Sequence, residues 1–312
     1  MSNYEEWRTY PPVDGVDYSS VDVVLPWLNP TRKWLEDYKG FCEDEDPCRI
    51  RDLNTIQPTL SGILKNLPWV RFVWLIVYDE EQLENVDFPE LKNEKIKVVY
   101  HRDIIPKEFL PNFNSLICAM FIHKIQGLAD RFLFFNDDMI VTTPIPKEMY
   151  FIGEKSVHQR SKHPRQSSSN HTILWGVILE NTHTILRKIT GGADFDIDNY
   201  HVPVPLRKDL IEYLWLKFEK EFYASCVNAH IRKPHSISLP ELAYWVEELY
   251  DYCVYKDIYK TIKRCFLVLC DTTTKDDIIN AYKNSDIVCL NDSEGLQEKY
   301  AEIGEYIKEV VV

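Results

Sequence analysis

The segment FLFFNDDMIV, residues 132–141, decides how the rest of the chain is interpreted. Its first four residues are apolar and predict a strand that is buried on both faces. Asn136, Asp137 and Asp138 follow at the point where this strand should leave the core. Two adjacent ionised carboxylates repel each other unless a cation or positive side chains offset their charge. The segment therefore predicts a buried strand that ends at a charged site.

Three further apolar segments alternate with helical patterns in the first half of the chain. The predicted strands are residues 21–27, 69–79, 96–101 and 132–141, and the predicted helices are residues 31–39, 55–67 and 114–129. This alternation predicts an α/β fold with a mostly parallel sheet and helices on both faces. Such sheets bind ligands at the carboxyl ends of their strands. Asp79, His101 and the Asp137–Asp138 pair lie at strand ends, whereas Asp22 stands at the beginning of the first strand.

Helical patterns dominate the chain after residue 150. Residues 173–191 could hold a strand and a helix, residues 201–222 open with prolines and become a helix, and residues 239–260 predict a further aromatic helix. Residues 265–271 and 286–292 are predicted strands, and residues 294–312 predict a helix docked on the core. The expected organisation is a lead-in (1–20), an α/β core (21–150), a mobile loop with a connecting strand and helix (151–200), a helical layer (201–265), and late strands that complete the core with a C-terminal helix (266–312).

The overall composition excludes several classes of protein. The chain has 312 residues with a net charge of -13, which argues against a general nucleic-acid binder. Its apolar runs are shorter than the roughly 18 residues that span a bilayer, so we expect at most peripheral membrane contact. The eight cysteines form no CxxC motif and follow no secretory leader, which predicts reduced thiols and a cytoplasmic protein, possibly peripheral at the inner face of the membrane. Cys118 and Cys289 are expected to be buried packing residues.

Three groups of basic residues could bind an anion or could equally be solvated. They are His158, Arg160, Lys162, His163 and Arg165 in a loop, His201 with Arg207 and Lys208, and His230 with Arg232, Lys233 and His235. Cations in the first turn of a helix oppose the helix dipole, so a bound phosphate would compensate for Arg207 and Lys208. The loop could close over an anionic substrate.

The Asn-Asp pattern recurs at the end of a second strand. Asn291 and Asp292 end the predicted strand at 286–292, as Asn136 and Asp137 follow the strand at 132. Carboxylate oxygens are the ligands that Mg²⁺ and Mn²⁺ prefer, and these metals bridge diphosphates in nucleotide-sugar enzymes. The alternative is a pair of solvated or helix-capping acids. The chain contains no P-loop, dinucleotide-binding, serine-hydrolase or zinc-protease motif.

These segments together resemble the Stealth family of sugar-1-phosphate transferases. The resemblance rests on VDVVLPWLN, RIRDLN, LKNLPWVRFVWLIVYD, LPNFNSLICAMFIHKIQGLADRFLFFNDDMIV, HVPVPLRKDL and CLND, which occur in this order between about residues 20 and 292. It implies a GT-A-like, Rossmann-type nucleotide-sugar-binding core with residues 201–265 on the acceptor side. It also implies transfer of hexose-1-phosphate from a UDP-sugar to a glycan hydroxyl, with release of UMP, in cell-surface polysaccharide synthesis.

The same resemblance implies roles for individual residues. It suggests catalytic roles for His201, Asp137, Arg207 and Arg232, with His201 as the base; nucleotide-sugar binding by Asp22, Arg51, Asp52, Asn114, Ser115 and Asn136; and binding of Mg²⁺ or Mn²⁺ by Asp138, Asp292 and Asn291.

The chain also departs from the family pattern. Pro30 and Arg32 replace a glycine and an acid, and Ala119 replaces a glutamate. Thr55, Pro58 and Ser61 stand where the family has acidic and aromatic residues and a further arginine. Two alternatives therefore stay open. One is a metal-dependent glycosyltransferase that transfers the sugar alone, and the other is a catalytically silent, glycan-binding relative.

Overall fold

The centre of the protein is a five-stranded sheet with the strand order β3-β2-β1-β4-β8. The computed structural model describes residues 15–42, 48, 50–84, 86–160, 174–190 and 201–311. The five strands are β1 (Val21–Pro26), β2 (Val73–Val77), β3 (Ile96–Tyr100), β4 (Arg131–Phe134) and β8 (Val204–Arg207). β1 to β4 run parallel, and β8 pairs antiparallel with β4. This sheet confirms the predicted α/β fold and its mostly parallel strands.

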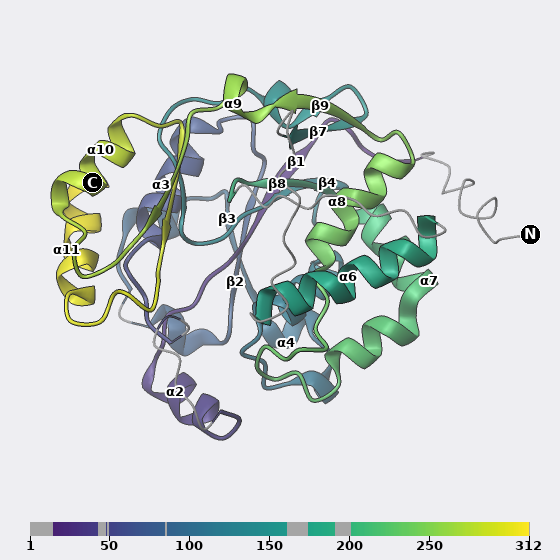
Figure 1. The fold of residues 1–312 in the computed structure, drawn as a ribbon, viewed down its shortest axis with the longest axis horizontal. Coiled ribbons are helices and arrows are strands. Elements are labelled where there is room, and N and C mark those ends of the chain that lie inside the picture. Colours follow the sequence, from purple (N-terminus) through teal and green to yellow (C-terminus); the bar gives the residue numbers. More distant parts are fainter. Residues whose placement is uncertain are drawn as a thin grey trace, which may run out of the picture.

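Helices cover both faces of this sheet (Figure 1). Val24, Ile76 and Phe132 point to one face, which is covered by α5 (Ser115–Met120), α6 (Leu174–Thr190), α7 (Lys208–Cys226) and α8 (Leu239–Leu249). Leu25 and Leu133 point to the other face, which is covered by α3 (Ile56–Asn66). Both faces of β1, β2 and β4 are therefore apolar, which explains the continuous apolar runs of the sequence.

The segment FLFFNDDMIV forms two strands and not the single strand that its sequence predicts. β4 ends at Phe134, and β5 (Met139–Val141) belongs to a second sheet with the order β10-β11-β5. The late strands β10 (Arg264–Val268) and β11 (Ile287–Asn291) form this second sheet instead of extending the central one. It is packed against α10 (Lys275–Lys283) and α11 (Tyr300–Val311). The Asn136–Asp138 turn therefore joins two sheets.

A third sheet corrects part of the predicted helical layer. It consists of β6 (Phe151–Ile152), β7 (Lys155–Arg160) and β9 (Cys253–Asp257). The predicted helix at 239–260 thus ends with α8, and its second half is β9 followed by α9 (Ile258–Thr261). The Val and Tyr residues of β9 favour a strand once β7 offers a parallel partner.

Other helices also differ from the predicted boundaries. Residues 174–190 form α6 alone, without a preceding strand in the described part of the chain. The predicted helix at 114–129 is shortened to α5 because the chain tightens into the 3-10 turn η5 (Ile122–Lys124). The remaining elements are α2 (Arg32–Lys39), α4 (His101–Ile104), η2 (Glu80–Leu83), η3 (Pro89–Lys92), η4 (Lys107–Phe109) and η6 (Lys147–Met149).

The C-terminal helix docks on the protein as predicted, but its partner is the second sheet. Leu296, Ile303 and Ile307 are fully buried, whereas Tyr300 is 44% exposed. Among the helices in the described ranges, none is both long and apolar enough to cross a bilayer.

Gly62 lets α3 approach β5 closely. A Cβ at this position would lie 2.5 Å from the carbonyl oxygen of Val141, and backbone cannot move aside as a flexible side chain can. We therefore expect Gly62→Ala to lower the free energy of unfolding by about 1–3 kcal/mol, measured by urea denaturation. Gly153→Ala is the control. A Cβ at Gly153 would meet nothing within 4 Å, but its φ is 57°, so this substitution shows the effect of backbone strain without a clash. Equal stability of Gly62→Ala and wild type would contradict the close approach.

Candidate functional site

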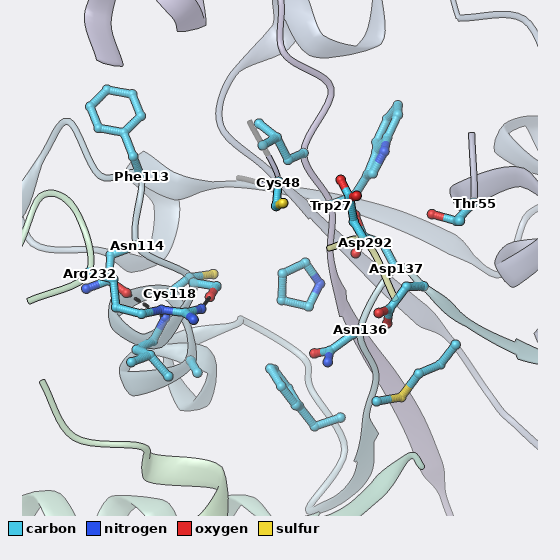
Figure 2. Close-up of a pocket in the computed structure, with 18 of the residues that line it drawn as sticks. Trp27, Cys48, Thr55, Phe113, Asn114, Cys118, Asn136, Asp137, Arg232 and Asp292 are labelled. Atoms are coloured by element: carbon cyan, nitrogen blue, oxygen red, sulfur yellow. Dashed lines mark hydrogen bonds between the residues drawn. The ribbon is translucent and has the colours of Figure 1, made fainter. Parts of the chain in front are cut away.

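A deep pocket of about 590 Å³ lies at the carboxyl ends of the central strands (Figure 2). Residues that follow β1, β2, β3 and β4 line it, together with the end of β11 and the start of α5. Most of the predicted site residues are present: Arg51, Asp52, Asn114, Ser115, Asn136, Asp137, Asp138, His201, Arg232, Asn291 and Asp292. The two Asn-Asp segments, from different strands, therefore meet in one pocket.

The Asn136–Asp138 turn is fixed through its backbone. The hydroxyl group of Thr59, on α3, donates a hydrogen bond to the carbonyl oxygen of Asp137 at 2.9 Å. The N–H of Leu290, on β11, donates to the carbonyl oxygen of Asp138 at 3.0 Å. Because these contacts use backbone atoms, both carboxylates remain in the lining of the pocket.

Three carboxyl groups share this wall of the pocket. The pKa of Asp137 is raised to about 8, first by burial and then by the nearby charges of Asp138 and Asp52. Burial also raises the pKa of Asp138 and that of Asp52 to about 6. Oδ2 of Asp138 accepts a hydrogen bond from the thiol of Cys289 at 3.2 Å, whereas its Oδ1 is buried and has no hydrogen-bond partner within the described ranges. Crowded carboxyl groups with an unpartnered oxygen fit a hard cation.

Asp292 is paired with a cation of the protein itself. Nε of Arg51 donates to Oδ2 of Asp292 at 2.5 Å, and Nη2 of Arg51 donates to Oδ1. Both oxygens of this predicted metal ligand are thus engaged. In the part of the chain that the structure describes, no group of three His, Cys, Asp or Glu side chains is arranged to hold a metal ion. Asp137 and Asp138 alone could still bind Mg²⁺, which commonly takes one or two carboxylates together with substrate phosphates and water.

Asn114 and Arg232 lie on the opposite wall (Figure 2), and Ser115, the residue after Asn114, also lines the pocket. Asn114 caps α5, and its Nδ2 donates to the carbonyl oxygens of Ala229 and Ile231 at 3.3 and 3.4 Å. The hydroxyl oxygen of Ser115 accepts a hydrogen bond from Nη2 of Arg232 at 3.0 Å. Asn114 therefore holds the loop that carries Arg232, and the guanidinium of Arg232 faces the carboxylate wall across the pocket.

His201 lies where the second sheet approaches the pocket. Its backbone has a φ of 48°, and its ring stacks on Phe266 of β10 with a centroid distance of 4.1 Å. Its Nδ1 is 3.8 Å from the sulfur of Cys289. The imidazole is therefore on the same side of the pocket as Asp138.

The structure does not bring Arg207 into the pocket. Arg207 is the last residue of β8 and pairs with Arg131, the first residue of β4, because these two strands are antiparallel. It is fully buried at the end of the sheet away from the pocket, and it donates to both oxygens of Asp209 at 3.1 and 2.7 Å. The carboxylate of Asp209 therefore compensates for the positive charge of Arg207 at the start of α7. The bound phosphate that the sequence suggested is not needed for this.

Asp22 is also remote from the pocket. It lies near the beginning of β1, and its fully buried carboxylate accepts hydrogen bonds from Arg71 at 2.9 and 2.7 Å, from the indole of Trp74 at 2.8 Å and from the N–H of Ala129 at 2.8 Å. Such a fully satisfied carboxylate ties together β1, β2 and the start of β4. The structure therefore favours a stabilising role over nucleotide-sugar binding.

An Asp22→Asn variant tests this assignment. Loss of the charged hydrogen bonds to Arg71 is expected to lower the free energy of unfolding by about 1.5–3 kcal/mol. Urea denaturation measures this loss, and donor binding per folded molecule should equal that of the wild type. Weakened donor binding with unchanged stability would instead support the predicted role of Asp22 in nucleotide-sugar binding.

Glu241 lines the pocket although no sequence signal identified it. It lies in the first turn of α8 and accepts a hydrogen bond from Ser238, so the pattern Ser-x-x-Glu indicates only the start of a helix. Burial raises its pKa to about 7. His101 and Trp175 also line the pocket without having been assigned a role in it.

The predicted loop with His158, Arg160, Lys162, His163 and Arg165 is only partly described. His158 is buried in β7 and lies 2.9 Å from a carboxylate oxygen of Glu247, so it belongs to the core and not to a loop. Lys162, His163 and Arg165 lie outside the described residues.

The sequence is similar to that of proteins of polysaccharide synthesis. Residues 49–159 match Stealth protein CR2, conserved region 2. A capsular polysaccharide phosphotransferase of Actinobacillus pleuropneumoniae is 30% identical over 224 residues, which are 67% of this chain and 60% of that protein. A capsular polysaccharide phosphotransferase of Actinobacillus suis is 30% identical over 234 residues, 70% of this chain and 62% of that protein. The chain thus spans less than two thirds of the length of these relatives.

Two solved structures with a partly similar fold are glycosyltransferases by name. Galactosyltransferase LgtC, in complex with donor and acceptor sugar analogs, has a TM-score of 0.43 and 8% identity, covering 93% of this chain and 96% of that one. Mouse xyloside xylosyltransferase 1 has a TM-score of 0.41 and 16% identity, covering 87% of this chain and 98% of that one.

Proposed function

The chain belongs to the Stealth proteins, whose conserved region 2 it carries in residues 49–159, and from this premise we propose that it transfers hexose-1-phosphate from a UDP-sugar to a hydroxyl group of a glycan. UMP is the leaving group, and the product is a phosphodiester in a cell-surface polysaccharide. The names of the relatives, capsular and exopolysaccharide phosphotransferases, support this type of transfer.

The observation that carries the proposal is the charge distribution in the pocket. Asp137 lies on one wall with Asp138 next to it in the chain, and Arg232 lies on the other, so carboxyl groups and a guanidinium group face each other across the cavity. Phosphoryl transfer depends on positioning and on the stabilisation of charge on the phosphoryl oxygens more than on a covalent intermediate. A pocket with these two walls suits a metal-bound diphosphate.

Each wall has a distinct role in this proposal. Mg²⁺ or Mn²⁺ held by Asp137 and Asp138 supplies positive charge to the donor diphosphate when it is bound. Arg232 contacts the transferred phosphoryl group from the opposite side through charge-assisted hydrogen bonds. Arg51 neutralises Asp292 and keeps that carboxylate from repelling the donor.

His201 is the proposed base. The acceptor hydroxyl oxygen attacks the phosphorus next to the sugar, the bond from this phosphorus to UMP breaks, and the hydroxyl proton moves to the imidazole of His201. The position of His201 beside the Asp138 wall supports this role, because the attacking oxygen must approach the same phosphorus that the carboxylate wall holds.

Product analysis tests the proposed reaction. The purified chain is incubated with UDP-N-acetylglucosamine, Mn²⁺ and a panel of capsular oligosaccharides, and nucleotides are separated by chromatography. We expect UMP and a phosphodiester signal in phosphorus NMR. Release of UDP would instead show transfer of the sugar alone, and absence of Mn²⁺-dependent donor binding in calorimetry would support the catalytically silent alternative.

A further inference from the structure

Cys289 occupies a position between two groups of the proposed mechanism. It lies on β11 with no exposed surface, next to the end of the strand that reaches the pocket. Its sulfur is 3.2 Å from Oδ2 of Asp138 and 3.8 Å from Nδ1 of His201. The sequence suggested a packing residue, but both contacts are polar.

The chemistry of the three side chains fixes the direction of these hydrogen bonds. Cysteine is a protonated thiol at neutral pH, and the thiol of Cys289 is placed to donate to Oδ2 of Asp138. Oδ2 of Asp138 can only accept when the carboxyl group is ionised, so the S–H of Cys289 donates to it. The sulfur lone pairs are then available to Nδ1 of His201, which must carry a proton to make the second contact.

This arrangement determines which nitrogen of His201 can act as a base. A neutral imidazole has one N–H and one nitrogen with a basic lone pair. If Nδ1 carries the proton, Nε2 has the lone pair. The stacking on Phe266 and the left-handed backbone at φ 48° hold the ring in one orientation. His201 is thus restrained in both tautomer and direction.

We propose that Cys289 is a positioning residue: its thiol links Asp138 to His201 and holds the imidazole in the Nδ1–H tautomer, with the basic lone pair on Nε2. The proposal rests on the function proposed above. It also accounts for both oxygens of Asp138. The thiol orients Oδ2, and the buried Oδ1, which has no hydrogen-bond partner among the described residues, is left for a cation. Partners of this kind, which orient a ligand without touching the metal, contribute 10- to 100-fold to affinity or activity in metal sites.

A pair of substitutions separates the hydrogen bonds from simple packing. Cys289→Ser keeps one donor and one acceptor at this position, whereas Cys289→Ala keeps neither. Cys226→Ala is a matched control, because Cys226 is a buried thiol on α7 that packs in the apolar core cluster on one face of the central sheet. We expect Cys289→Ala to lower kcat about 10- to 100-fold with an unchanged KM for the donor, and Cys289→Ser to recover most of this loss.

A spectroscopic measurement tests the proposal without substrate or metal. Long-range proton–nitrogen NMR spectra of the histidine rings at pH about 8.5, above the ordinary histidine pKa of about 6.5, distinguish the two neutral tautomers. The His201→Gln variant identifies the signals of His201. We expect the Nδ1–H form in the wild type and in Cys289→Ser, and a mixture or the Nε2–H form in Cys289→Ala.

Product analysis tests the proposed function, and the tautomer of His201 tests the role of Cys289, so the two proposals can fail independently. If the wild type releases no UMP, the proposed function is wrong, yet the tautomer of His201 still decides the role of Cys289. An Nε2–H form in the wild type, or identical spectra for wild type and Cys289→Ala, overturns the positioning role even in an active enzyme. Equal loss of kcat in Cys289→Ala and Cys226→Ala would show that only packing is affected.

Discussion

An Asp138→Asn variant is expected to fold as the wild type does and to lose about 10²- to 10³-fold in transfer rate. Asn has the shape of Asp and keeps an oxygen that can accept the hydrogen bond from Cys289. It lacks the negative charge, and it changes the chemistry at Oδ1, the buried oxygen without a partner among the described residues. Fixed charges around a transferring phosphoryl group stabilise the transition state in a site where water is excluded, so their loss affects kcat directly.

Metal binding should distinguish Asp138 from Asp292. Mn²⁺ is expected to raise the melting temperature of the wild type and of Asp292→Asn, because Asp292 is engaged on both oxygens by Arg51. It should leave the melting temperature of Asp138→Asn unchanged. Thermal shifts at increasing Mn²⁺ measure this, and Mg²⁺ is the second metal to compare.

The opposite pattern would reassign the site. If Asp292→Asn abolishes the thermal shift while Asp138→Asn retains it, then the Arg51–Asp292 pair opens when a metal binds and Asp292 is the ligand that the sequence predicted. A shift lost in both variants would mean that both carboxylates contact the cation.

The central sheet could be predicted from the sequence because parallel strands buried on both faces are continuous apolar runs. Residues 21–27 and 69–79 contain β1 and β2 for this reason, whereas residues 96–101 contain the partly exposed edge strand β3. β9 could not be predicted, because its aromatic residues continue the pattern of α8 and its partner β7 is almost 100 residues away in sequence. The sequence likewise did not show that the chain changes sheets at Asn136, since Met139–Val141 is as apolar as the strand before it.

The pocket was largely predictable because strand ends in a parallel sheet meet at one edge. The exceptions follow from strand direction. Arg207 lies at the far end because β8 runs antiparallel to β4, and direction cannot be derived from a motif. Asp22 begins its strand and therefore belongs to the opposite edge. Glu241 was missed because its pattern with Ser238 is also that of an ordinary helix start.

A His201→Gln variant is expected to lose about 10²- to 10⁴-fold in turnover and to bind the UDP-sugar as the wild type does. Gln can still form hydrogen bonds, but it cannot accept a proton at neutral pH. The donor is held by the Asp137–Asp138 wall and by Arg232 in our proposal, so donor affinity does not depend on this ring. Single-turnover rates measure the chemical step, and calorimetry with UDP-N-acetylglucosamine and Mn²⁺ measures donor binding.

His235→Gln provides the matched control for this experiment, because His235 is exposed and its ring contacts only the carbonyl oxygen of Val227 among its described hydrogen bonds. Equal turnover of His201→Gln and His235→Gln would remove His201 from the mechanism. Glu241 would then be the next candidate, since it lines the same pocket and its pKa near 7 is suited to proton transfer at neutral pH. A loss of turnover in His201→Gln alone, with unchanged donor binding, would show that His201 acts in proton transfer and not in donor binding. The donor would then be bound by the carboxylate wall without help from His201.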